Sequence, residues 1–163
     1  MRDQEFAEYV ERRSGSLRSG AFLLCGNWHD AEDLVQTALL RLYRVWDRVH
    51  GVDALDAYVR AIVVRAFLDE KRRPWRRERA MTALPETPDR PPDIEERLVV
   101  QAALATVPPG QRAVLVLRFW EDLSVEQTAA ILGISVGTVK SQTQDGRATL
   151  RAALAGTGLR GRL

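Results

Sequence analysis

A proline-rich stretch near the middle of the chain constrains the fold more than any other feature. Residues 82–93, TALPETPDRPPD, hold four of the seven prolines. Proline fixes φ and has no amide hydrogen to donate, so this stretch cannot be the interior of a helix. It divides the 163 residues into two parts of similar length. We therefore expect domains over 1–80 and 94–155, a linker over 81–93, and a glycine-rich tail over 156–163 that forms no helix.

Both parts of the chain have the periodicity of amphipathic helices. Apolar residues recur every three or four positions from Ala31 to Trp46 and from Val59 to Phe67, and this spacing places them on one helix face. No run of residues shows the sustained alternation of a half-buried strand. The sequence therefore predicts an all-α protein made of two small helical domains.

Turn and capping residues indicate where the helices begin and end. Gly26 is expected to end a first helical region, and either Asn27 or Asp30 to cap the next helix. The expected elements are one or two helices over 5–25 with an interruption at Ser14–Ser16, then helices over 30–46, 55–73, 94–106 and 110–120, and two more beginning at Ser124 and Ser135.

Composition excludes several classes of protein. The only cysteine, Cys25, allows neither an internal disulfide nor a cysteine zinc cluster, and its apolar neighbours favour a small buried residue over a reactive thiol. No apolar run is long enough to span a bilayer, and the polar N-terminus does not resemble a signal peptide, so we expect a cytoplasmic protein. P-loop, Rossmann, HExxH and GxSxG motifs are all absent, so we expect no enzyme activity, metal or cofactor.

The segment from Ser124 to Thr138 predicts a helix-turn-helix. Ser124 and Gln127 form a capping box that begins the first helix, Gly133 supplies the left-handed residue of the turn, and the small Ala129 lets the two helices approach closely. In this motif the second helix enters the major groove and its N-terminal residues contact bases. The alternative is a plain helical hairpin without a DNA-binding role.

Two motifs carry a resemblance to a known family. Residues 30–36, DAEDLVQ, resemble the start of the polymerase-binding helix of sigma domain 2, and residues 123–141, LSVEQTAAILGISVGTVKS, resemble the helix-turn-helix of sigma domain 4. Over about residues 3 to 155 the chain is similar to extracytoplasmic-function sigma factors, in particular to the actinobacterial SigE-like subgroup. The resemblance implies a factor that directs promoter-specific transcription initiation.

The resemblance also implies three sets of binding residues. The polar face expected to bind core RNA polymerase comprises Asp33, Gln36, Thr37, Leu40, Arg41 and Arg44. The set expected to hold the melted minus-ten strand comprises Arg48, His50, Asp53, Asp56, Tyr58, Arg60, Arg65, Lys71, Arg72 and Arg73. The set expected to recognise the minus-thirty-five duplex comprises Ser135, Thr138, Lys140, Ser141, Gln144, Asp145, Arg147 and Arg151.

Cations that follow phosphates and aromatic faces that stack on bases are what single-strand binding requires. Tyr58 and Trp75 are the aromatic candidates, whereas Phe67 fits the apolar face and is expected in the core. The implied partners are the β′ clamp helices and β flap of core polymerase, duplex and single-stranded promoter DNA, and an anti-sigma factor.

Some residues depart from the family pattern. Arg65 stands where many members have Asn, Asp145 would repel phosphate, and Gly146 weakens a helix by about 1 kcal/mol relative to Ala. A stand-alone helix-turn-helix regulator is the main alternative function, but it would leave the DAEDLVQ helix unexplained. A helical anti-sigma-type adaptor would have no need of a recognition helix.

Overall fold

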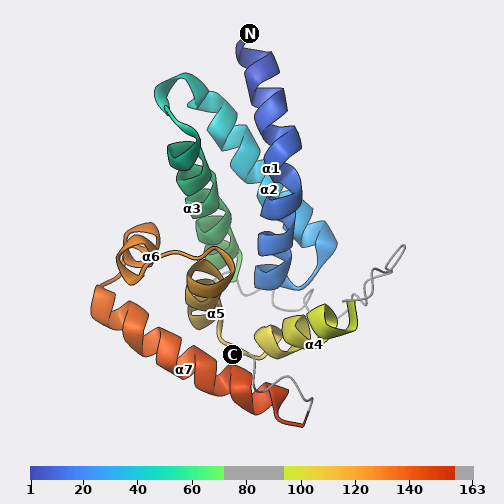
Figure 1. The fold of residues 1–163 in the computed structure, drawn as a ribbon, viewed down its shortest axis with the longest axis vertical. Helices are drawn as coiled ribbons and strands as arrows, with labels where there is room; N and C mark the ends of the chain where they lie inside the picture. Colours follow the sequence, from blue (N-terminus) through green and yellow to red (C-terminus); the bar gives the residue numbers. More distant parts are fainter. Residues whose placement is uncertain (72–93, 157–163) are drawn as a thin grey trace. The chain divides into compact units, whose positions relative to one another are not determined.

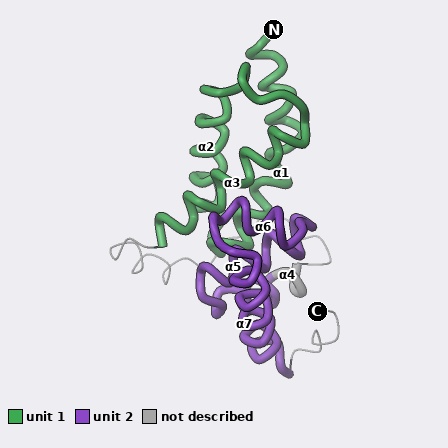
Figure 2. Tube along the Cα trace, turned by 90° about the vertical axis from the view of Figure 1, so that its left-hand side faces the viewer, with its two compact units in different colours: residues 1–72 green, residues 73–163 purple. Residues whose placement is uncertain are grey.

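The computed structural model describes residues 1–71 and 94–156, with side chains from residue 98 onward in the second stretch. Within these ranges the chain is helical and has no strand, which confirms the all-α fold. The chain divides into an N-terminal unit, Met1–Arg72, and a C-terminal unit, Arg73–Leu163 (Figure 2). The expected linker over 81–93 lies outside the described residues, as does most of the expected tail.

The N-terminal unit is a bundle of three helices, visible as α1, α2 and α3 in Figure 1. These are α1 (Arg2–Cys25), α2 (Trp28–Arg44) and α3 (Val52–Lys71), with a short 3-10 helix, η1 (Trp46–Arg48), after α2. Each helix turns its apolar face inward. The largest fully buried side chains of this unit are Tyr9, Leu24, Leu34, Leu42, Val59, Val64 and Phe67.

Helix α1 is continuous, so the interruption expected at Ser14–Ser16 is wrong. Tyr9 lies before that point and Leu24 beyond it, and both are fully buried. Packing on both sides of a weak helix-forming segment outweighs its low propensity, because most helix stability in proteins comes from tertiary contacts. Nothing lies within 4 Å of where a Gly15 Cβ would be, so this glycine does not mark a close approach.

The turn between α1 and α2 follows the capping rules. Gly26 ends α1 in the left-handed region at φ 73°, as predicted. Of the two candidate caps, Asn27 is the one used, since its side chain accepts a hydrogen bond from the Asp30 amide at 3.2 Å. Phe22 and Trp28 stack across the turn with ring centroids 4.1 Å apart.

Over residues 94–156, the part of the C-terminal unit that the structure describes, there are four α-helices and one π-helical turn. They are α4 (Ile94–Ala105), α5 (Pro109–Leu115), the π-helical turn η4 (Val116–Trp120), α6 (Val125–Leu132) and α7 (Val136–Leu154). The helix expected over 110–120 therefore starts one residue earlier and loses its α geometry after Leu115.

A buried arginine joins α4 to α5. The Arg112 guanidinium donates to the carbonyl of Ala105 at 3.2 Å and to that of Val107 at 2.8 Å, and the side chain is buried. The last carbonyls of a helix lack partners within it, and a cation there is also favoured by the helix dipole. Arg112 thus links α5 to the end of α4 and to the turn after it.

Gly146 has a packing role that its sequence context did not indicate. A Cβ at this position would lie 3.1 Å from Cδ1 and 3.2 Å from Cγ of Leu115. The glycine therefore allows α7 to approach α5 closely, and its low helix propensity is offset by this contact between buried residues.

The buried Thr128 hydroxyl generates the first prediction. Thr128 is 0% exposed, and its Oγ1 has no hydrogen-bond partner among the described residues. Thr128→Val keeps the shape and removes a desolvated hydroxyl, so it should stabilise the protein by about 1 kcal/mol. Ser124→Ala, four positions earlier, should instead cost about 1 kcal/mol because it removes the capping box. The free energy of unfolding of both variants is measured by urea unfolding of the full chain, monitored by the circular dichroism signal of the helices. A loss of stability in Thr128→Val would show that the hydroxyl is hydrogen-bonded in solution.

Candidate nucleic-acid interface

Helices α6 and α7 form the predicted helix-turn-helix. The Ser124 Oγ accepts from the Gln127 amide at 3.0 Å, and the Gln127 Oε1 accepts from the Ser124 amide at 2.9 Å. Gly133 adopts the left-handed conformation with φ 66° and ψ 35°. Ala129 packs with Val114 and Val139 in the buried cluster beneath the turn. The caps, the turn and the small contact residue therefore occupy the places the motif requires.

The N-terminal end of α7 is capped and polar. Ser135 Oγ accepts from the Thr138 amide at 3.0 Å and lies 2.8 Å from the Thr138 hydroxyl. The Ser141 hydroxyl donates to the Thr138 carbonyl at 3.1 Å. These short side chains are engaged with the helix backbone, which leaves the longer ones to extend outward.

The longer candidate side chains of α7 lie on one side of the helix. Positions 140, 144, 147 and 151 follow the i, i+4, i+7, i+11 spacing that brings residues to one face. Lys140, Gln144 and Arg151 are exposed, and Asp145 is exposed beside them. Lysine and glutamine are the donors suited to guanine and adenine edges. A helix with this face has the chemistry to bind in a DNA major groove.

Arg147 is positioned differently from its neighbours. It is only partly exposed, and its Cζ lies 5.5 Å from the ring centroid of Phe119 on η4. Arg118 lies over the same ring at 5.7 Å. Phe119 is itself 54% exposed. The arginine thus contacts the domain as well as facing toward solvent, a role the sequence pattern did not reveal.

The predicted polymerase-binding face lies on the outer side of α2. Asp33, Gln36, Arg41 and Arg44 are exposed, and Thr37 is partly exposed. Leu40 stands out among them because it is apolar and yet 65% exposed. An aliphatic side chain amid polar neighbours contributes little to the fold when it is exposed, but it becomes favourable when a partner covers it.

The predicted minus-ten residues differ in how exposed they are. Arg48, His50, Asp53, Tyr58 and Arg65 are exposed, whereas Arg60 and Lys71 are partly exposed. The side chains of the first three lie at or beside the connection between α2 and α3, and the others follow along α3. Arg72, Arg73 and Trp75 lie outside the described residues.

Two other candidates of this region point into the domain. Phe67 is 1% exposed, which confirms its expected place in the core. The Asp56 carboxylate accepts a hydrogen bond from the Tyr9 hydroxyl at 2.7 Å and pairs with Arg13 at 3.1 Å. Asp56 is therefore engaged by α1, and the sequence alone gave no sign of this contact between residues 47 positions apart.

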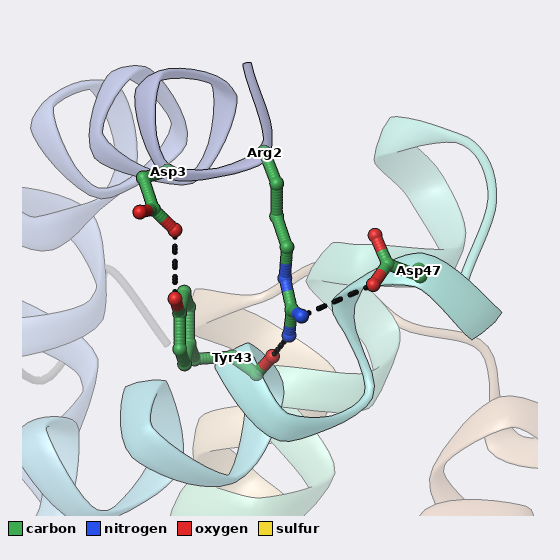
Figure 3. A network of polar contacts seen from close by, with 4 residues as sticks. All are labelled: Arg2, Asp3, Tyr43 and Asp47. Carbon is green, nitrogen blue, oxygen red and sulfur yellow. Dashed lines mark hydrogen bonds and ion pairs between the residues drawn. The ribbon is translucent and has the colours of Figure 1, made fainter.

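Another set of contacts that sequence reasoning missed joins the start of α1 to the end of α2 (Figure 3). The Arg2 guanidinium donates to the Tyr43 carbonyl and pairs with Asp47 at 3.2 Å. The Tyr43 hydroxyl donates to Asp3 at 2.7 Å, and this hydrogen bond raises the pKa of Tyr43. Arg2, Asp3 and Asp47 are exposed and Tyr43 is partly exposed, so each contact contributes little by itself.

The cysteine has the environment of an unreactive thiol. Cys25 is partly buried, and its Sγ lies 3.1 Å from the Ala21 carbonyl and 3.2 Å from the Asn27 carbonyl. Burial raises the pKa of the Cys25 thiol to about 11, so the nucleophilic thiolate is scarce at neutral pH.

The described residues hold no group of three or more His, Cys, Asp or Glu side chains able to hold a metal ion. None of the helices that the structure describes combines the length and apolar character needed to cross a membrane.

Family models match both units of the chain. The model described as Sigma-70 region 2 matches residues 9–77, and the model described as Sigma-70, region 4 matches residues 97–150. The first includes α2 and α3, and the second includes the helix-turn-helix.

Curated relatives extend the similarity to most of the chain. The RNA polymerase sigma-E factor of Streptomyces coelicolor is 38% identical over 157 residues, which cover 92% of this chain and 86% of the relative. The sigma-E factor of Streptomyces avermitilis is 39% identical, with 92% and 85% covered. The ECF RNA polymerase sigma factor SigE of Mycolicibacterium smegmatis is 36% identical, with 91% and 61% covered.

Solved structures share the fold. The sigma factor RpoE from Bartonella quintana, in complex with the anti-sigma factor NepR, superposes with a TM-score of 0.74 at 24% identity, covering 94% of this chain and 98% of that one. CnrH, in complex with the cytosolic domain of CnrY, gives a TM-score of 0.64 at 22% identity, covering 93% and 88%. The matches to Sigma-70 regions 2 and 4, in this order, and the similarity to these curated relatives show that the chain belongs to the extracytoplasmic-function RNA polymerase sigma factors. These factors direct promoter-specific transcription initiation.

Proposed function

We propose that the chain binds core RNA polymerase through α2, recognises the minus-thirty-five duplex through α7, and holds the melted minus-ten strand with the α2–α3 connection and α3. The observation that carries the proposal is that one chain combines a well-capped helix-turn-helix with an α2 face whose polar and apolar side chains are left exposed. A stand-alone regulator needs only the first of these features.

The polymerase contact is proposed for Asp33, Gln36, Thr37, Leu40, Arg41 and Arg44. Acidic residues near the start of α2 and basic residues near its end suit the helix dipole, so charge alone would not require a partner. Leu40 does favour one, because burying an exposed leucine contributes about 2 kcal/mol to binding.

The minus-ten contact is proposed for the exposed residues Arg48, His50, Asp53, Tyr58 and Arg65, together with Arg60 and Lys71. The cations would follow the phosphates, and Tyr58, 37% exposed, would present an aromatic face to a base. We assign Asp56 a supporting role, because its carboxylate is already engaged by Tyr9 and Arg13. Arg72 and Arg73 remain predicted contacts.

The minus-thirty-five contact is proposed for α7. Lys140 and Gln144 would donate to base edges. Ser135 and Thr138 would hold a phosphate at the helix start. Ser141 and Arg151 would contact the DNA backbone. Arg147, which lies against Phe119, is proposed as a phosphate contact. Asp145 opposes phosphate binding and could accept from a cytosine amine.

The remaining partners follow from the family. The β flap is the proposed contact of the C-terminal unit, and an anti-sigma factor is a proposed regulator, supported by the complexes in which RpoE and CnrH were solved. The chain would act in the cytoplasm, where polymerase and DNA are found. Phosphodiester synthesis would belong to the polymerase, so we propose no catalytic role for this chain.

Run-off transcription tests the proposal as a whole. Sigma-free core polymerase and a pool of native promoter fragments are incubated with and without the protein. We expect transcripts with defined starts only when the protein is present. If none appears while the protein alone still shifts duplex DNA, the stand-alone regulator is correct instead.

Leu40 provides a specific test of the polymerase contact. Leu40→Asp should weaken binding to core polymerase by about tenfold or more, because the interface loses an apolar contact and gains a buried charge. The free energy of unfolding should stay within about 0.5 kcal/mol, since the side chain is exposed in the free protein. Ala7→Asp, which puts the same carboxylate at an exposed site on α1, is the matched control and should leave core affinity unchanged. Fluorescence anisotropy with labelled protein measures the core affinity of both variants, and urea unfolding measures their stability.

Two exposed neighbours on α7 test the duplex contact with opposite expected signs. Lys140→Ala should weaken binding of the holoenzyme to the minus-thirty-five element by about 1–3 kcal/mol. Asp145→Asn should strengthen binding to duplex DNA of any sequence, because it removes repulsion of the phosphates. Filter binding across a range of salt concentrations measures both. Weakening by both substitutions would indicate that Asp145 accepts a hydrogen bond from a base.

A further inference from the structure

One side chain on α1 contacts both Trp46 and Asp56, and the segment between these two residues includes most of the α2–α3 connection, residues 45–51. The Tyr9 ring lies 5.6 Å, centroid to centroid, from the ring of Trp46, which stands near the start of the connection. The Tyr9 hydroxyl donates at 2.7 Å to Asp56, which stands on α3 beyond the connection. A single residue thus joins the two ends of the segment between Trp46 and Asp56.

Burial and two neighbouring side chains on α1 support this contact. Tyr9 is 2% exposed, and burial together with the hydrogen bond to Asp56 raises the pKa of Tyr9. Arg13, one turn along α1, pairs with the same carboxylate at 3.1 Å. Phe6, almost one turn earlier, meets Trp46 edge-on at 5.3 Å. Three positions of one helix face therefore hold both ends of the connection.

The segment between these contacts is open to a ligand. Arg48, His50, Gly51 and Asp53 are all exposed. Gly51 adopts φ 90°, a conformation that side-chain-bearing residues rarely take, and nothing lies within 4 Å of where its Cβ would be. The backbone therefore makes a sharp turn between two firmly held ends.

We propose that Tyr9 is the positioning residue for the minus-ten loop, the segment between Trp46 and Asp56. It fixes the distance between these two residues so that the loop is preformed to receive an unstacked base. The inference rests on the proposed function, since that function assigns the loop its DNA contact. A preformed loop does not have to be ordered when DNA binds, and preorganisation of this kind raises affinity without any new contact.

The test compares two tyrosines of the same aromatic cluster. Tyr9→Phe keeps the ring against Trp46 and removes the hydroxyl bonded to Asp56. Tyr43→Phe is the matched control, because it removes a hydroxyl that donates to Asp3 at the same distance of 2.7 Å but does not hold the far end of the loop. Each full-length variant is assembled with core polymerase and titrated with a forked promoter fragment whose minus-ten non-template strand is unpaired.

A second substitution, in the DNA, separates positioning from general destabilisation. An abasic site replaces the minus-ten nucleotide whose loss most weakens binding of the wild-type holoenzyme. On intact DNA we expect Tyr9→Phe to bind about tenfold more weakly than wild type, because a loop that is no longer held at Asp56 has to be ordered when the DNA binds. On abasic DNA the affinities of Tyr9→Phe and wild type should differ by no more than about twofold, because the effects of coupled contacts are not additive. Tyr43→Phe should match wild type on both.

Several outcomes would overturn the inference. Equal weakening of Tyr9→Phe on intact and abasic DNA would mean that the hydroxyl supports only the fold. Equal effects of Tyr9→Phe and Tyr43→Phe, or no effect of either, would also contradict it. Failure of the proposed function is a separate result, because then the wild-type protein itself would neither start transcripts nor confer binding of the forked fragment on core polymerase.

Discussion

Burial of one apolar stripe per helix is the constraint on which the rest of the described structure depends. Once Leu34, Leu42 and their neighbours on α2 face α1 and α3, the opposite face of α2 must face outward. The same holds for α7, where burial of Val139 and Leu150 leaves Lys140 and Gln144 exposed. The proposed partner surfaces are thus set by the cores beneath them.

Polar contacts then specify how the helices connect. Arg112 binds the last carbonyl of α4 and one in the turn beyond it, and Tyr9 and Arg13 bind Asp56 near the start of α3. Both arrangements place a charged group in a partly or fully buried setting, where a lost partner costs more than the bond itself contributes. They therefore fix the geometry of a connection, and in the N-terminal unit that connection is the proposed minus-ten loop.

Local features of the chain were accessible from the sequence because their causes are local. The capping box at Ser124, the left-handed Gly133 and the Asn27 cap each involve residues within five positions of one another, and residue type alone nearly determines such contacts. Periodicity identified Phe67 as a core residue for a related reason, since the helical repeat relates neighbours along the chain. The family resemblance rested on the same local segments, and the relatives confirmed it.

The sequence by itself thus determined the helical class, the helix-turn-helix, the family and the polar faces. Only the tertiary structure decided that α1 is continuous past Gly15, that Leu115 packs closely against Gly146, and that Asp56 accepts a hydrogen bond from Tyr9. These outcomes depend on residues far apart in the chain. Their energies arise from packing and desolvation, which exist only once the helices have come together.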